Sequence, residues 1–243
     1  MEAPVEAAER SPFITQDWSA YTPDDHEAWR LLYDRRMREL ETTGSRVFLD
    51  GARAIGLGRD AVPDLARVNA LLAARTGWAA VPVRGFLPAR EFFACLARRR
   101  FPTTVTVRSK DRLDYVPEPD IFHDVFGHVP LHADPVFADF LQAFGRLAES
   151  ATDERLTGLT RLFWFTVEFG LIRESGGVKV YGSGLISSAG DAANALSDRC
   201  DRRPFSLDAV VAQPFAIDRF QDVLFVVDTF DQLFDAVRRL RDS

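Results

Sequence analysis

The sequence predicts one helix-rich α+β domain with a few short strands. The chain has 243 residues, of which 47% are hydrophobic and 27% charged, enough for one full-sized core in a globular protein. Apolar residues recur at helical spacing over most of the length, whereas β-branched alternation is confined to short stretches. No internal repeat or low-complexity linker divides the chain, so we expect a flexible N-terminal tail over residues 1–15 and one domain over residues 16–243.

The first helix begins in the stretch YTPDDHEAWRLLYDRRMREL. Thr22 is a favourable N-cap residue, Pro23 suits the first helical position, and the two aspartates that follow favour the positive end of the helix dipole. The second helix should end at Gly77. The expected helices are 21–40, 62–77, 89–100, 135–151, most of 154–175, and 231–242. The expected extended segments are 78–85, 101–109, 178–188 leading into a turn, and short pieces at 215–220 and 223–230.

Composition narrows the class of protein. The formal net charge of -6 argues against a general nucleic-acid or membrane-surface binder. The N-terminus carries no apolar signal segment, and no run of about 18 apolar residues could span a bilayer. Cys95 and Cys200 could form one disulfide, but two free thiols in a reducing compartment are the commoner outcome. We therefore expect a cytoplasmic protein without a nucleic-acid or membrane partner.

Three of the four histidines lie within or directly after the stretch EPDIFHDVFGHVPL. His123 and His128 are five residues apart, which on a regular α-helix turns their side chains about 140° away from each other. This spacing excludes the His-Glu-x-x-His geometry of helical zinc peptidases. Gly127 and Pro130 suggest that the helix loosens or stops, so that His128 can swing back toward an ion held by His123. Hydrogen-bonded histidines without a metal are the alternative, and His132 is expected to be a spectator.

Glu168 is the only charged residue in the stretch LFWFTVEFGLI. A buried carboxylate must be paired, protonated or bound to a metal, because its desolvation is costly. An ion pair with Arg161 or Arg173 is one possibility, and metal ligation is favoured by the clustered histidines upstream. Two imidazoles and one carboxylate are the donor set of non-haem Fe(II) oxygenases, and zinc hydrolases use the same ligands. The donor set alone does not choose between the two metals.

Three stretches in the same order, EPDIFHDVFGHVPL, FWFTVEFGLI and YGSGLISS, closely resemble the aromatic amino acid hydroxylases. The resemblance covers nearly the whole chain, and the forty residues from His128 to Glu168 are the spacing of that family. It implies the aromatic amino acid hydroxylase fold and one catalytic Fe(II) bound by His123, His128 and Glu168. It also implies a tetrahydropterin cosubstrate and O2, with the protein binding and orienting the reactants.

The resemblance further implies which residues bind the cofactor. Leu87 and Phe92 match positions that contact the pterin, and Asp124 stands where the family has an acidic residue beside the first histidine. A phenylalanine ring offers a stacking surface for a flat heterocycle, although plain core packing is the ordinary alternative for Phe92.

Four other positions match the substrate site of the family. Arg108 matches the arginine that clamps the substrate carboxylate, a task that suits a guanidinium because it forms two parallel hydrogen bonds. The alternative for Arg108 is a solvated loop arginine. Trp164 should wall the pocket around the aromatic side chain, and Gly184 and Ser187 should line the site.

Three positions depart from the family pattern. Val116 replaces a threonine that animal members have in the substrate pocket, and Phe163 replaces a tyrosine, which removes a hydroxyl near the cofactor. Ser183 replaces an alanine between two glycines. We expect these changes to affect fine specificity and not the iron site.

The resemblance implies hydroxylation of L-phenylalanine to L-tyrosine. Hydroxylation of another aromatic amino acid or ring position, such as tryptophan at carbon 5 or phenylalanine at carbon 3, is the runner-up. A zinc hydrolase or a non-catalytic binding module are the alternatives from other classes. About 90 residues precede the pterin stretch and read as helices of the same fold, and the last helix has no sustained heptads. We therefore expect a monomer whose rate depends hyperbolically on phenylalanine.

Overall fold

A computed structural model describes residues 11–114 and 119–242, and in this part of the chain the expected helix-rich α+β fold is confirmed. Segments labelled η are short 3-10 or π-helices. The helical segments are η1 (Trp18–Ala20), α1 (Pro23–Thr43), α2 (Arg46–Ala54), α3 (Leu65–Thr76), α4 (Ala89–Ala97), η2 (Lys110–Arg112), η3 (Phe122–His128), η4 (Val129–Ala133), α5 (Pro135–Glu149), α6 (Asp153–Phe163), η5 (Trp164–Glu168), α7 (Ser183–Ser187), α8 (Ala189–Leu196), α9 (Leu207–Ala212) and α10 (Asp231–Asp242).

Two small sheets accompany the helices. The first pairs β1 with β2 in parallel, and the second has the strand order β4-β3-β6-β5. In the second sheet β3 is antiparallel to β4 and parallel to β6, so that Leu171 lies opposite both Val180 and Val226. The strands are β1 (Ala79–Pro82), β2 (Arg100–Thr103), β3 (Leu171–Glu174), β4 (Gly177–Val180), β5 (Asp201–Pro204) and β6 (Val223–Val227).

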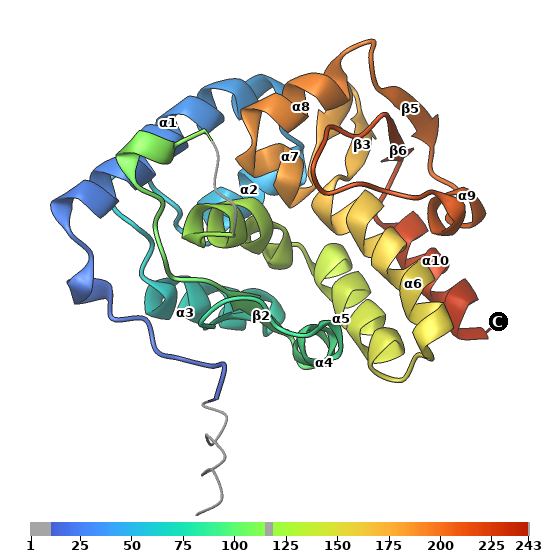
Figure 1. The fold of residues 1–243 in the computed structure, drawn as a ribbon, viewed down its shortest axis with the longest axis horizontal. Helices are drawn as coiled ribbons and strands as arrows, with labels where there is room; N and C mark the ends of the chain where they lie inside the picture. The colour runs from blue at the N-terminus through green and yellow to red at the C-terminus, as the bar shows by residue number, and fades with distance from the viewer. Residues whose placement is uncertain (1–10, 115–118, 243) are drawn as a thin grey trace, which may run out of the picture.

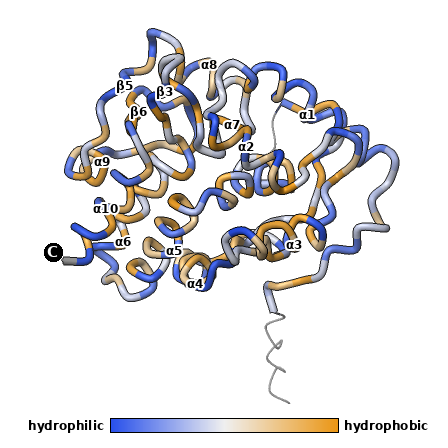
Figure 2. Tube along the Cα trace, turned by 180° about the vertical axis from the view of Figure 1, so that it is seen from behind, coloured by the Kyte–Doolittle hydropathy of each residue, from blue (hydrophilic) through white to orange (hydrophobic). Residues whose placement is uncertain are grey.

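The segments η3 and η4 lie at the centre of the molecule, with the other elements arranged around them (Figure 1). η4 packs on α2, α3 and α5, and η3 packs on α7 and β2. Phe122 and Phe126 of η3 stack with their ring centroids 4.4 Å apart. Trp29 of α1 meets both rings edge-on, and Phe48 of α2 meets Phe126 in the same way. Hydrophobic residues dominate the inner helix α5, whereas hydrophilic residues are frequent along the outer helix α1 (Figure 2).

The predicted start of α1 and the predicted end of α3 are both confirmed. Thr22 caps α1 in a capping box: its side chain accepts from Asp25 N, and the Asp25 carboxylate accepts from Thr22 N at 2.8 Å. α3 ends at Gly77, which takes the left-handed conformation with φ of 75° that favours glycine.

Residues 154–175 are helical for most of their length, as expected: α6 and η5 run to Glu168, and residues 171–174 then form β3 in the middle of the second sheet. One expectation about secondary structure is wrong. Residues 178–188 begin as the strand β4, but the stretch that follows is the helix α7 and not a turn. For β3 and α7, tertiary pairing with β6 or packing on η3 decides the conformation, and neither is visible in local sequence.

Residues 1–10 of the expected flexible tail lie outside the described residues. The remainder of that tail is hydrogen-bonded to the segment around β1: Arg84 N donates to Pro12 O at 3.0 Å, and Ile14 N donates to Pro82 O at 3.0 Å. Residues 12–14 therefore pack with the domain.

Two further findings concern the class of protein. Cys95 and Cys200 are both buried free thiols, as the sequence indicated. Among the described residues, every helix is too short or too polar to cross a membrane.

Gly51 lets α2 approach the segment that follows the histidine stretch. A Cβ atom built on Gly51 would lie 2.0 Å from the Pro130 carbonyl oxygen, a distance that real Cβ atoms do not reach. Because the clashing atom belongs to the backbone, no side-chain rotation can relieve the overlap. The close packing of α2 on η4 therefore requires glycine at this position.

We predict that Gly51→Ala lowers the free energy of unfolding by about 1–3 kcal/mol, the usual cost of overpacking a well-packed interface. Alanine is the better helix former by roughly 1 kcal/mol, so the clash must overcome that gain. Gly58→Ala is the matched control, because a Cβ there would meet nothing within 4 Å, and it should change stability by less than about 0.5 kcal/mol. Urea denaturation measures both, and equal stability of the two variants would contradict the prediction.

Candidate active site

Two short π-helices carry the residues expected to bind a metal. In a π-helix each N–H bonds to the carbonyl five residues back, so residues five apart lie about one turn above each other. η3 is wound in this way, which places His123 and His128 on the same face. η5 ends at Glu168 and is closed by Phe169 N, which donates to Trp164 O at 2.8 Å.

The helix therefore does not stop at Gly127 or Pro130, and His128 does not swing back at a break. The wide winding extends over the whole of η3, and the narrower 3-10 winding of η4 follows it, with Pro130 near its start. His123 and His128 still come together, as a shared ion would require, but they do so within one continuous π-helix.

The three expected ligands converge on one point. His123 Nε2 lies 3.3 Å from Glu168 Oε1, and His128 Nε2 lies 3.2 Å from Glu168 Oε2. One ligand atom from each of the three residues falls within 4.8 Å of the other two. Three donors from two helices thus face a common centre, with spacing that a single ion can bridge.

The arginines that could have paired with Glu168 bond to other groups: Arg161 donates to the Val211 carbonyl, and Arg173 pairs with Asp228. Burial by itself would raise the pKa of the Glu168 carboxyl, but the two imidazoles and a hydrogen bond from the Ser183 hydroxyl lower that pKa to about 2. Glu168 is therefore a carboxylate at neutral pH, the form in which it can ligate a metal.

Ser187 fixes the tautomer of His123. The Ser187 hydroxyl has one proton, and it donates that proton to the Ser183 carbonyl at 2.8 Å. It must therefore accept from His123 Nδ1, which lies 2.9 Å away. Because Nδ1 then carries the hydrogen, Nε2 presents its lone pair toward Glu168, as a metal ligand requires.

His132 is not part of this cluster. Its Nδ1 lies 2.9 Å from the His128 carbonyl, its ring is packed against Trp78 and Phe101, and its Nε2 is buried without a hydrogen-bond partner in the described residues. Burial lowers the pKa of His132 to about 3, so the ring is neutral. The spectator role expected from the sequence agrees with these contacts.

Arg108 is held in a fork by Asp120. Its Nε and Nη2 each donate to a different Asp120 oxygen at 2.8 Å, and its Nη1 donates to the Leu113 carbonyl at 3.1 Å. The pair is buried, with the two side chains 9% and 3% exposed. The Arg108 side chain has five N–H groups, and three of them make these bonds to described residues. Two N–H groups are left to donate to another acceptor.

Asp120 also connects Arg108 to His123, one of the expected metal ligands, because its Oδ1 accepts the backbone N–H of His123 at 3.0 Å. The sequence interpretation did not single out Asp120. An aspartate three residues before the first histidine, at the start of a helical run, is the signal that could have identified it as a capping residue. The second bond, to Arg108, depends on the tertiary fold.

Asp124 is directed away from the centre, toward β2 and the segment that follows it. Its Oδ2 accepts from Thr104 N at 2.6 Å and from Thr104 Oγ1 at 2.7 Å. Burial raises the pKa of Asp124, and the neighbouring His123 and the Thr104 hydrogen bonds oppose that rise. The contacts found for Asp124 therefore anchor η3 beside β2.

The two other expected cofactor residues lie on the side of α4. Leu87 is half-buried in the segment that leads into α4. Phe92 meets Phe163 edge-on with ring centroids 5.5 Å apart, and Phe163 in turn lies 6.5 Å from the His128 ring. Phe92 is thus separated from His128 by one aromatic ring, that of Phe163, which departs from the family pattern.

Gly184 lies beside Glu168, and Trp164 packs against the adjoining Phe169. The Trp164 ring stacks on Phe215 with centroids 4.3 Å apart and lies 4.8 Å from Phe169. A Cβ built on Gly184 would lie 3.1 Å from Glu168 Oε1, so glycine keeps this side of the carboxylate clear. Phe215 was not expected from the sequence; it lies in the irregular segment between α9 and β6.

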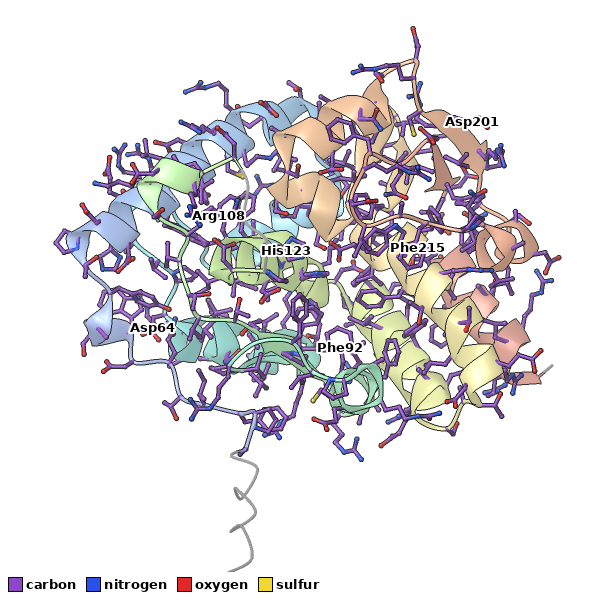
Figure 3. All side chains as sticks on the ribbon, in the orientation of Figure 1. Asp64, Phe92, Arg108, His123, Asp201 and Phe215 are labelled. Carbon is purple, nitrogen blue, oxygen red and sulfur yellow. The ribbon has the colours of Figure 1, made fainter. Side chains whose placement is uncertain are left out.

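Figure 3 shows the arrangement of the labelled residues: in this view Arg108 and Phe215 lie on opposite sides of His123, and Phe92 lies below it. The structure thus gathers His123, His128, Glu168, Gly184 and Ser187 at the centre, with the other described positions around them. Val116, the third departure from the family, lies outside the described residues.

The site offers two imidazole nitrogens and one carboxylate oxygen, which converge from neighbouring helices. This is the donor set of the mononuclear non-haem iron enzymes. A zinc hydrolase could use the same three ligands, so similarity to known proteins is needed to separate the two classes.

A family model described as biopterin-dependent aromatic amino acid hydroxylase matches residues 16–242. The phenylalanine-4-hydroxylase of Ralstonia nicotianae is 45% identical over 220 residues, which cover 90% of this chain and 70% of that protein. The crystal structure of Chromobacterium violaceum phenylalanine hydroxylase with bound oxidised Fe(III) has a TM-score of 0.90 at 42% identity, covering 93% of this chain and 83% of that one. A structure of the same enzyme with iron(III) and 7,8-dihydrobiopterin has a TM-score of 0.89 at 40% identity, covering 96% and 87%. The chain belongs to the biopterin-dependent aromatic amino acid hydroxylases.

We predict that His123→Ala, His128→Ala and Glu168→Ala each lose bound iron while they remain folded, because each removes one of three converging donors. His26→Ala is the matched control, since His26 accepts a hydrogen bond from Val62 N and is not part of the cluster. Iron content by elemental analysis and circular dichroism of the purified variants check the prediction. Full iron occupancy in any of the three would remove that residue from the ligand set.

Proposed function

We propose that this chain is an Fe(II)- and tetrahydropterin-dependent monooxygenase that uses O2 to hydroxylate L-phenylalanine to L-tyrosine. The observation that carries the proposal is the convergence of His123, His128 and Glu168 within 4.8 Å, in a chain of the biopterin-dependent hydroxylase family. The relatives named phenylalanine-4-hydroxylase support phenylalanine as the substrate.

In this proposal His123, His128 and Glu168 hold Fe(II), which together with the reduced pterin supplies the activation of O2. The protein contributes ligand geometry. Ser187 keeps His123 in the tautomer with a free Nε2, and the low pKa of Glu168 keeps the third ligand ionised. The ligands are therefore ready to bind a divalent cation without a change of protonation at Glu168.

Arg108 binds the carboxylate of phenylalanine in this proposal. Asp120 fixes the orientation of the guanidinium, and the remaining N–H groups of Arg108 can donate to the substrate. Trp164, stacked on Phe215, supplies an apolar wall for the aromatic side chain. Gly184 and Ser187, next to the ligands, complete the substrate side of the site.

We place the pterin on the side of Leu87 and Phe92, where the Phe92 ring is half-buried and available as a stacking surface. Asp124 serves this site indirectly, because its bonds to Thr104 hold η3 against the segment after β2. We further propose a cytoplasmic monomer that acts on a small molecule and has no nucleic-acid or membrane partner, supported by two unpaired buried thiols and a net charge of -6.

Product analysis tests the proposed function. The purified protein is incubated with Fe(II), O2, a tetrahydropterin and, in separate reactions, phenylalanine, tyrosine or tryptophan. We expect tyrosine from phenylalanine, with no product when O2 or pterin is omitted. A tryptophan or 3-hydroxylated product would overturn the substrate and position, and amide hydrolysis with zinc that ignores O2 would overturn the reaction class.

We predict that Arg108→Lys lowers kcat/KM for phenylalanine about ten- to over a hundredfold, because lysine keeps the charge but loses the fork, and a charged hydrogen bond contributes roughly 1.5–3 kcal/mol. Arg112→Lys, at an exposed arginine of η2, is the matched control and should leave kcat/KM unchanged.

The same variant also disturbs the bond to Asp120, so the substrate itself must report on the contact. With phenethylamine, which lacks the carboxylate, Arg108→Lys should have a much smaller effect than with phenylalanine. An equal loss with both compounds would show that Arg108 acts only through the fold.

A further inference from the structure

The Ser183 hydroxyl lies between two of the metal ligands. Its Oγ is 2.7 Å from His128 Nε2 and 2.9 Å from Glu168 Oε2, and the residue is fully buried. It is therefore in contact with two of the three residues that the proposed function assigns to a metal. The proposed function gives this hydroxyl no role of its own beyond its hydrogen bond to the Glu168 carboxylate.

The hydrogen-bond roles in this group follow from counting protons. The geometry makes Ser183 Oγ the donor and Glu168 Oε2 the acceptor, so this bond uses the single hydroxyl proton of Ser183. The contact with His128 must then run the other way, with Nε2–H donating to Ser183 Oγ. For Nε2 to bind a metal, His128 must adopt the tautomer that carries its hydrogen on Nδ1, and this second bond is then lost, but the bond from Ser183 to Oε2 requires no change.

The fold leaves Ser183 little freedom to move. Its carbonyl accepts from the Ser187 hydroxyl, and Gly127 of η3 packs so closely on it that a Cβ at Gly127 would lie 3.1 Å from Ser183 Cβ. The far end of α7 is held by Arg36 of α1, which donates to the Leu185 and Ile186 carbonyls at 3.0 and 2.8 Å. The hydroxyl is thus presented to Glu168 from a fixed position.

We propose that Ser183 is a positioning residue of the metal site, which holds Oε2 of Glu168 in a hydrogen bond so that the carboxylate offers a metal ion Oε1 alone. The inference rests on the proposed function, because it takes His123, His128 and Glu168 as the ligands. The hydrogen bond would set how many coordination positions Glu168 takes on the metal ion. A carboxylate bound through one oxygen occupies one position, whereas a carboxylate bound through both occupies two. Ser183 therefore keeps one more position open for reactants.

The test uses Co(II) as a spectroscopic probe in the whole protein, since the intensity of its d–d absorption falls as the coordination number rises. Metal-free wild type, Ser183→Ala and the control Ser188→Ala are each titrated with Co(II). Ser188 is the matched control because its hydroxyl bonds to Asp191 at the start of α8 and contacts none of the ligands. We expect Ser183→Ala to show weaker d–d absorption per bound Co(II) than wild type, and Ser188→Ala to match wild type.

A crystal structure of the Co(II)-loaded wild type gives an independent answer and does not depend on the folding of a variant. It should show Glu168 bound through Oε1, with Oε2 still within hydrogen-bond distance of Ser183 Oγ. Both carboxylate oxygens on the metal, Ser183 Oγ as a ligand, or identical spectra for Ser183→Ala and wild type would each overturn the inference.

The outcomes separate this inference from the proposed function. A wild type that binds neither Co(II) nor Fe(II) would overturn both. A wild type that binds the metal and makes tyrosine, but whose spectrum does not change in Ser183→Ala, would overturn the role of Ser183 alone.

Discussion

The wide winding of η3 is the constraint on which the candidate active site depends. With ordinary α-helical winding His123 and His128 would point about 140° apart, and they could not share an ion. Over residues 122–128 the π-helix removes that divergence. Stacking of Phe122 on Phe126 and the close contact of Gly127 with Ser183 hold the segment on both sides, so the unusual winding is stabilised by packing and not by local sequence preference.

A buried cluster of two imidazoles and a carboxylate requires compensation at every polar atom, because an unpaired buried charge costs several kcal/mol. The fold supplies that compensation from α7. Ser187 accepts from His123 and Ser183 donates to Glu168, so residues one helical turn apart serve two different ligands. Gly184, between them, leaves room for the carboxylate. One short helix therefore positions two of the three candidate ligands, His123 and Glu168.

Two buried arginines fix the elements around this centre. Arg36 ties α1 to the carbonyls at the end of α7, and Arg108 is locked by Asp120, whose carboxylate also accepts the backbone N–H of His123. Each guanidinium thus joins segments that are far apart in sequence, which suits a group with five donors in a rigid plane. The orientation of Arg108 is in this way coupled to the start of the helix that carries His123.

The sequence by itself determined the fold class, most helix positions, the cap at Thr22, the helix end at Gly77, and the candidate ligands His123, His128 and Glu168, because these depend on periodicity, local backbone preference and spacing along the chain. Only the tertiary structure decided the π-helical winding, the strand β3 after Glu168, and the partners of Arg108, Asp124 and Ser183. These features arise from contacts between residues distant in the chain. A hydroxyl or carboxylate carries no local mark of the group it will meet, so its partner is defined only when the elements pack.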